Sequence, residues 1–240
     1  MPLASLRTLR TFPKALKFNG NEYVVVSPFN FNEITVEIWF KANIPNQLHS
    51  NGLVQNMEDC FESKGGWDIY FSYMSPVLIS GSGTTNNGDF YWCEIKNDLW
   101  YQLVFTWSSS IQELYKNAVR EFYRTPTVGP PTDLTSSFWI GRAKQCWGNK
   151  YFIGNVAIVR YYSKILNQSE IQHNYNNPLN PITDGLVLWL DWTSIDIANG
   201  LWLDRSGYGN EGTIYGATEE TIIKSPVRKL NRVRLLNAVR

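Results

Sequence analysis

The densest group of acidic residues is the stretch EDCFE at residues 58–62. Two carboxyl groups act together as a general acid and a general base only where both side chains reach the same site. Residues on a strand share a face only when they alternate, and this stretch shows no clean alternation. Glu37 and Glu94 each stand alone. The acidic residues therefore predict no catalytic pair, and we expect a protein that is not an enzyme.

Cysteine and histidine predict no metal site. Cys60, Cys93 and Cys146 are an odd set, so at most one disulfide forms. Cys60 and Cys93 are candidates to meet across neighbouring strands, with three reduced, half-buried cysteines as the alternative. The histidines are His49 and His173, and the spacings typical of zinc ligands are absent.

Loops that mix Gly, Ser and Asn with aromatic residues form the candidate ligand-binding surface. The stretches SGSGTTNNGDFYW (80–92) and KQCWGNKY (144–151) have this composition. Adaptable polar loops often carry recognition, and flat Trp and Tyr rings suit sugar rings or a protein partner. The predicted ligand-binding residues are Trp67, Asn87, Asp89, Trp92 and Trp147. A core or hairpin position is the alternative for each of them.

Short strands must position these residues. Residues 34–41 alternate cleanly, with Ile34, Val36, Ile38 and Phe40 on one face and Thr35, Glu37, Trp39 and Lys41 on the other. Similar runs, bounded by turn residues, occur at residues 16–18, 23–26, 67–73, 76–80, 89–95, 100–108, 111–117, 138–143 and 151–164. Repeated short strands indicate an all-β protein, a two-sheet antiparallel β-sandwich.

One short helix is predicted near residues 167–176. The segment NQSEIQHNY (167–175) offers Asn167 or Ser169 as the N-cap, and the Asn-Asn-Pro that follows ends the helix. The first three residues also fit an N-glycosylation sequon. We interpret them as a helix cap.

Both ends of the chain are basic. Residues 1–17 and 221–240 hold ten of the 22 basic residues and no acid, which leaves 12 basic residues in the body against all 21 acidic ones. Such asymmetry predicts that the tails contact something negative: copies of the chain, other subunits, a membrane surface or nucleic acid. Apolar residues recur at every third position, at Leu3, Leu6, Leu9 and Phe12 and at Leu230, Val233, Leu236 and Val239. We expect these stripes to dock on neighbouring copies.

The amino-terminal residues lack the apolar core of a signal peptide, and no run reaches about 18 apolar residues, so no membrane span is predicted. We divide the chain into a basic tail (1–13), one sandwich (14–218) and a second basic tail (219–240).

Five pieces of the sequence, in order, carry a resemblance: ALKFNGNEYVVV, ITVEIWFKA, WYQLVFTWSSSIQELYKNAV, FWIGRAKQCWGNKYFIGNVAIVRYYSK and ILNQSEIQHNYN. They resemble the laminin G-like members of the concanavalin A-like lectin/glucanase superfamily. The resemblance implies a jelly-roll sandwich, and calcium in an acidic turn after a phenylalanine. Here that turn reads Phe18-Asn19-Gly20-Asn21-Glu22, with amides in place of aspartates, which weakens a calcium site. We therefore predict no cofactor, and keep calcium at this turn as the alternative.

The resemblance also concerns the order of the pieces. In the family, the equivalent of DGLVLWLD (184–191) with DRSGYGNEGTIYGA (204–217) comes first, whereas here it follows the helix. A sandwich without these strands exposes unpaired backbone groups at a sheet edge. We expect residues 185–216 to supply the missing strands, either by folding back as a circular permutation or by donation to the next subunit.

The predicted function is that of a non-catalytic structural or recognition subunit of an extracellular or virion surface assembly, with glycan binding. A free carbohydrate-binding lectin is the first alternative, and a glycoside hydrolase is the second. The sequence does not decide among them, because one fold serves many functions.

Overall fold

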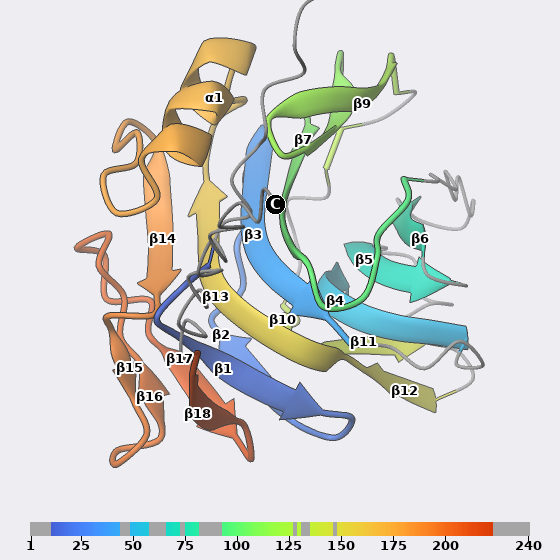
Figure 1. Ribbon diagram of the computed structural model, residues 1–240. Coiled ribbons are helices and arrows are strands. Elements are labelled where there is room, and N and C mark those ends of the chain that lie inside the picture. The colour runs from blue at the N-terminus through green and yellow to red at the C-terminus, as the bar shows by residue number, and fades with distance from the viewer. Residues whose placement is uncertain are drawn as a thin grey trace, which may run out of the picture.

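The computed structural model describes residues 11–43, 49–57, 66–72, 75–81, 93–126, 129–130, 135–145 and 148–222. These residues form two antiparallel sheets packed face to face, with one helix. In Figure 1, β1, β3 and β13 lie in front of β2, β4 and β10. We call the two layers the front sheet and the back sheet. The predicted all-β, two-sheet sandwich is confirmed.

The front sheet has the strand order β18 (Thr218–Thr221), β1 (Lys14–Asn19), β13 (Ile153–Tyr162), β3 (Ile34–Ala42), β7 (Trp100–Trp107), β8 (Gln112–Lys116) and β9 (Val119–Arg124). An eighth strand, β14 (Leu186–Asp191), also pairs with β13. Because β3 occupies the other edge of β13, β14 and β1 lie end to end along one edge of that strand.

The back sheet has the strand order β15 (Ile195–Asp196), β16 (Leu201–Trp202), β17 (Gly212–Tyr215), β2 (Tyr23–Val26), β10 (Phe138–Ile140), β4 (His49–Met57), β5 (Gly66–Ser72) and β6 (Ser75–Gly81). A separate two-stranded hairpin joins β11 (Arg142–Gln145) to β12 (Gly148–Tyr151). The strands β4, β9, β12, β15, β16 and β18 were not predicted. In β4, β9 and β18, polar residues hide the apolar alternation.

The core lies between the two sheets and contains the apolar face of β3 that the alternation predicts: Ile34, Val36, Ile38 and Phe40. The opposite face of β3 is buried as well. Helix α1 (Gln168–Asn176) covers it, with Tyr175 stacked on Trp39, and Ile171 belongs to a buried cluster with Val104 and Tyr115. Asn167 is the N-cap, since its side chain accepts the backbone N–H groups of Ser169 and Glu170.

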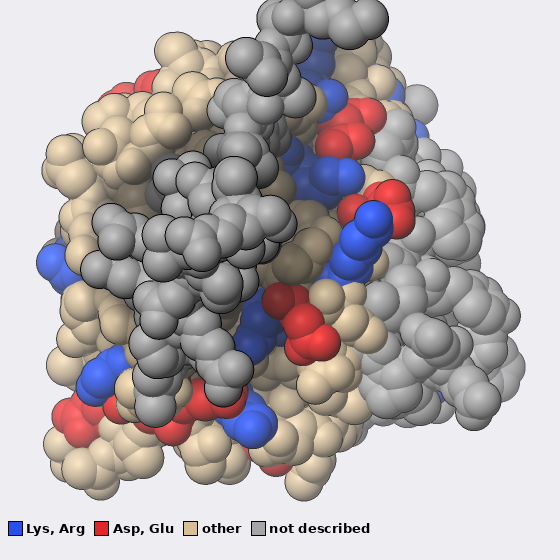
Figure 2. All heavy atoms as spheres, in the orientation of Figure 1, with Lys and Arg blue, Asp and Glu red and all other residues tan. Residues whose placement is uncertain are grey.

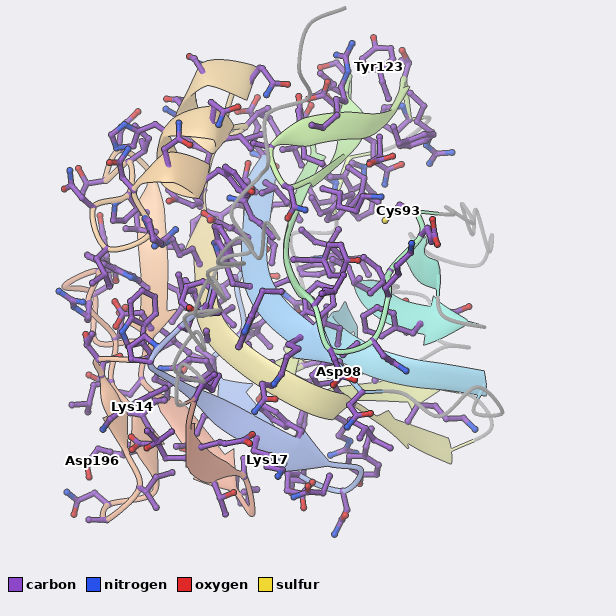
Figure 3. All side chains as sticks on the ribbon, in the orientation of Figure 1. Lys14, Lys17, Cys93, Asp98, Tyr123 and Asp196 are labelled. Atoms are coloured by element: carbon purple, nitrogen blue, oxygen red, sulfur yellow. The ribbon has the colours of Figure 1, made fainter. Side chains whose placement is uncertain are left out.

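The carboxyl-terminal strands pair within the same chain. β14 pairs with β13, β17 with β2, and β18 with β1. Residues 186–221 therefore complete both sheets of their own sandwich. Lys14 and Lys17, labelled in Figure 3, form ion pairs across the β1–β18 ladder with Glu219 (2.9 Å) and Glu220 (4.0 Å). Figure 2 shows basic and acidic side chains interspersed over the described part of the front face.

The turn at residues 19–22 joins the two sheets, because β1 and β2 belong to different layers. Two local expectations need correction. Residues 93–95 are not a strand. Phe12, the last member of the amino-terminal stripe, packs on its own chain, with its ring centroid 4.8 Å from that of Trp100 and 4.8 Å from that of Trp192.

Candidate functional site

The solvent-facing side of the back sheet carries a group of aromatic residues. Val24, Ile140 and Ile214 point toward the core, so the residues that alternate with them point outward. Tyr23, Trp139 and Tyr215 are the outward residues on β2, β10 and β17. Strand pairing thus brings together side chains that lie up to 192 positions apart in the sequence.

Aromatic contacts link these side chains. Tyr23 and Tyr215 sit directly opposite each other and stack, with ring centroids 4.7 Å apart and an interplanar angle of 22°. Trp139 lies 5.4 Å from Tyr23, and Tyr151 of β12 lies 6.3 Å from it. Tyr215 is 47% exposed, so its outer ring face is open to solvent. We call Tyr23, Trp139, Tyr151 and Tyr215, together with Arg142, the aromatic cluster.

Arg142 lies at the centre of the aromatic cluster. Its guanidinium carbon is 4.3 Å from the ring centroid of Trp139, 5.3 Å from that of Tyr23 and 6.0 Å from that of Tyr151. A guanidinium over aromatic faces is attracted by the ring quadrupoles and stays charged. The cluster therefore combines flat apolar faces with one fixed positive charge.

Two glycines place Arg142 there. Gly141 has φ +81°, which turns the chain out of β10 into the β11–β12 hairpin. The hairpin then packs against β4 at Gly52, where an added Cβ would lie 2.1 Å from the backbone nitrogen of Ala143. Within the hairpin, Arg142 is directly opposite Tyr151. Both side chains consequently reach the same outer surface of the back sheet.

A row of directly opposed residues runs across the back sheet from the cluster: Thr213, Val25, Trp139, Gln55 and Asp68. Asp68 in this row is 1% exposed, and its Oδ1 has no hydrogen-bond partner among the residues that the structure describes. Burial raises the pKa of Asp68 to about 8. Burial, and to a smaller extent the charge of Asp68, raises the pKa of Tyr70 to about 12. Asp68 is therefore mostly uncharged at neutral pH.

The predicted ligand-binding residues lie elsewhere or outside the described part of the chain. Trp67 is 1% exposed and packs in the core, with its ring centroid 5.8 Å from that of Phe105. Trp67 and Asp68 point to opposite faces of β5, and the ring of Trp67 is on the core face, so it offers no face to a ligand. Asn87, Asp89, Trp92 and Trp147 fall outside the described residues.

Sequence reasoning missed most of the aromatic cluster. The predicted loop 144–151 ends on Tyr151, but Tyr23, Trp139, Arg142 and Tyr215 were read only as parts of strands. The alternation Tyr23, Val25 against Val24, Val26 was the available signal. It marks two faces, yet it does not say which face the other sheet covers.

The lone acid Glu37 forms a buried network with no access to solvent. Its Oε1 accepts hydrogen bonds from Trp39 Nε1 (2.8 Å), Gln102 Nε2 (2.8 Å) and Arg160 Nη1 (3.0 Å). Its Oε2 accepts one from Asn174 Nδ2 of α1 (2.9 Å). Glu37 thus ties β3, β7, β13 and the helix together. Glu94 is exposed, and residues 58–62 lie outside the described chain.

The turn at residues 19–22 does not fit a calcium ion. Oε2 of Glu22 accepts the backbone N–H groups of Asn19 (2.5 Å) and Asn21 (3.2 Å). Burial raises the pKa of Glu22, but hydrogen bonds from backbone N–H groups outweigh it and hold the pKa below its usual value. Within the described ranges, no three His, Cys, Asp or Glu side chains gather to hold a metal.

Cys93 is a free, buried thiol, and burial raises its pKa to about 12.

Comparison with protein families is decisive for the fold. Residues 18–172 match the family model Laminin_G_3, described as "Concanavalin A-like lectin/glucanases superfamily". The chain belongs to this superfamily. The matched region runs from the end of β1 through β13 to the middle of α1, whereas β14 to β18 lie beyond it. No curated protein matches the sequence.

Solved structures share the superfamily fold. A "putative carbohydrate binding protein" from Bacteroides ovatus ATCC 8483 has a TM-score of 0.71 and 19% identity, over 89% of this chain and 61% of its own. Tailspike protein 2 of Escherichia coli O157:H7 bacteriophage CAB120 has a TM-score of 0.52 and 13% identity, over 80% of this chain and 31% of its own. The sialyllactose-bound CBM40 of Ruminococcus gnavus IT-sialidase has a TM-score of 0.51 and 10% identity, over 66% and 95%. The chain spans about three fifths of the Bacteroides protein. No helix in the described ranges is long and apolar enough to cross a membrane.

Proposed function

We propose that the chain is a non-catalytic carbohydrate-binding sandwich that takes its ligand on the aromatic cluster. The observation that carries this proposal is the stack of Tyr215 on Tyr23, with the outer face of Tyr215 open to solvent. Apolar faces of sugar rings pack on flat aromatic rings, and a pre-packed ring loses little freedom on binding. The carbohydrate-binding neighbours of the same fold are consistent with this use of the sandwich.

The test compares two exposed tyrosines. Tyr215→Ala removes the open ring of the cluster, and Tyr208→Ala removes a ring that is 70% exposed and has no ring contact among the described residues. Binding is measured on a glycan array and then by calorimetry, and the melting temperature reports the fold. We expect Tyr215→Ala to weaken binding by roughly ten-fold or more, and Tyr208→Ala to leave it unchanged. Glycan binding that is equal in both variants contradicts the proposal.

A second proposal concerns assembly: the chain serves as a structural or recognition subunit of an extracellular or virion surface assembly. The two basic tails support it, because they join the sandwich side by side at Pro13 and Ile222. Eight basic residues and no acid lie in residues 1–10 and 223–240. Such a local charge suits acidic surfaces of neighbouring copies, other subunits or nucleic acid.

Particle size tests the assembly proposal. The full chain is compared by light scattering with a variant that lacks residues 1–10 and 226–240 and keeps Phe12 and Ile222. We expect a defined large particle for the full chain and a folded monomer for the variant. A full chain that is monomeric, or a variant that still assembles, contradicts this second proposal.

A further inference from the structure

We propose that Glu22 is a positioning residue of the aromatic cluster: it holds Tyr23 and Tyr215 in their stacked arrangement and does not itself contact the glycan. This inference rests on the proposed glycan-binding function and adds a residue to that site. Glu22 directly precedes Tyr23, on whose ring Tyr215 stacks at 4.7 Å. The contacts of Glu22 therefore bear directly on where the two rings stand.

Glu22 lies where the chain crosses twice between the two sheets. Residues 20–22 lead from β1 to β2, and residues 216–217 lead from β17 to β18. β1 pairs with β18 in the front sheet, and β2 pairs with β17 in the back sheet, so the two crossings run side by side. Tyr23 and Tyr215 stand directly opposite each other at the back-sheet end of these crossings. The relative position of the rings therefore depends on how the two crossings are held together.

The side chain of Glu22 contacts both crossings. Its Oε2 accepts the backbone N–H groups of Asn19 (2.5 Å) and Asn21 (3.2 Å) at the first crossing. At the second crossing, Gly216 has φ +77°, and a Cβ added there would lie 3.2 Å from Cγ of Glu22. Hydrogen bonds to a charged acceptor are stronger than those between neutral groups. The carboxylate thus fixes the first crossing, while the stem of the same side chain packs against the second.

Glu22 is engaged away from the open ring face. Its carboxylate is turned toward the backbone of its own turn, whereas the outer ring face of Tyr215 is turned toward solvent. Side chains alternate along a strand, so Glu22 and its neighbour Tyr23 are directed to different sides of the chain. A substitution at Glu22 should therefore affect a bound glycan only through the position of the rings.

A double-mutant cycle in the full-length protein separates positioning from direct contact. It compares the parent, Glu22→Ala, Tyr215→Ala and the double variant, and each glycan that the parent binds on a glycan array is then titrated by calorimetry. Nuclear Overhauser contacts between the ring protons of Tyr23 and Tyr215 report the stack without any glycan.

Two further variants are the controls. Glu22→Gln keeps the stem of the side chain and one oxygen acceptor. Glu170→Ala removes a carboxylate with the same local role, because Oε2 of Glu170 accepts the backbone N–H of Asn167 (2.8 Å). Glu170 belongs to helix α1, which covers the outer face of the front sheet, on the other side of the sandwich from the aromatic cluster.

We expect Glu22→Ala to lose the ring contacts and to weaken glycan binding by roughly ten-fold, and to add no further loss in the Tyr215→Ala background. Glu22→Gln should keep the ring contacts and most of the binding, and Glu170→Ala should bind like the parent, with melting temperatures confirming that every variant is folded.

Losses that add in the double variant, or ring contacts that persist in Glu22→Ala, overturn the inference and leave the proposed glycan-binding function standing. An equal loss of binding in Glu170→Ala has the same meaning. Binding that ignores Tyr215→Ala, or no binding of the parent to any glycan, overturns both.

Discussion

The backbone N–H of Ile222 donates a 2.8 Å hydrogen bond to the carbonyl oxygen of Pro13. Pro13 immediately precedes β1 and Ile222 immediately follows β18, and these two strands pair along their length. The beginning and the end of the described sandwich are therefore neighbours. This contact explains how a segment that resembles the opening of a domain can follow the rest of the sandwich in the sequence. β14 pairs with β13 directly beside the start of β1, so it lies where a strand that preceded β1 would also lie.

Truncation at Thr183 tests the role of the carboxyl-terminal strands. The shortened chain loses β14 to β18 and leaves one edge of β13 and of β2 unpaired. We expect it to be insoluble or unfolded, because open edges and uncovered apolar residues favour aggregation. Addition of a peptide of residues 184–222 should restore the circular dichroism spectrum of the sandwich. A truncated chain with the melting temperature of the full chain would show that the segment is an independent appendage.

Phe12→Ala tests whether the end of the amino-terminal tail belongs to the folded body. The Phe12 ring is 3% exposed and lies among Trp39, Trp100 and Trp192. Removal of a buried phenylalanine ring typically costs about 3–5 kcal/mol of the free energy of unfolding. Denaturant unfolding measures this loss, and Tyr208→Ala, at an exposed position, should stay within about 0.5 kcal/mol of the parent. Equal stabilities of the two variants would refute the packing role.

Glu37→Gln tests the buried network below helix α1. The variant leaves the fully buried guanidinium of Arg160 without its charged partner. We expect a loss of about 3–5 kcal/mol in the free energy of unfolding, because an uncompensated buried charge is costly. The matched control is Glu94→Gln, which breaks the exposed pair with Lys96 and should cost less than about 1 kcal/mol. If Glu37→Gln unfolds at the same denaturant concentration as the control, the network adds no stability.

Asp68→Asn tests the buried carboxyl group in the cross-strand row. Its pKa is about 8 in the folded protein, against an ordinary value of 3.8. The carboxyl group of Asp68 loses its proton at a lower pH in the unfolded chain than in the folded protein. The free energy of unfolding of the parent should therefore fall as the pH rises from about 4 to about 8, by up to about 5 kcal/mol. Asp68→Asn should remove this fall and be the more stable protein at pH 8. The comparison requires urea unfolding at pH 4, 6 and 8, and parallel curves for the two proteins would contradict the assignment.

The sequence predicts the sandwich well because alternation decides it locally. Ile34, Val36, Ile38 and Phe40 lie in the core as their spacing requires. The same rule, applied to residues 67–71, places Trp67 with Ile69 and Phe71 in the core and Asp68 on the opposite face of β5, so the burial of Trp67 was readable from its neighbours. The prediction of Trp67 as a ligand-binding residue relied on its aromatic ring and disregarded its position in the alternation.

The aromatic cluster was less predictable, for a physical reason. Tyr23 and Tyr215 meet only because β17 returns to pair with β2, and Arg142 reaches them only because Gly141 turns the chain out of β10. Local spacing gives the face of each side chain. It does not give which strands are neighbours, and a surface site depends on those neighbours.

The construction of the cluster from distant strands couples ligand occupancy to the folding of the last segment. Tyr215 belongs to β17, whereas Tyr23, Trp139 and Arg142 belong to the part of the chain before the helix. A ligand that spans them binds only when the carboxyl-terminal strands are in place, so occupancy opposes their detachment. At a free ligand concentration of 100 times Kd, this thermodynamic linkage is worth about 2.7 kcal/mol. A bound glycan would then act as a clamp between the two parts of the chain that the helix separates.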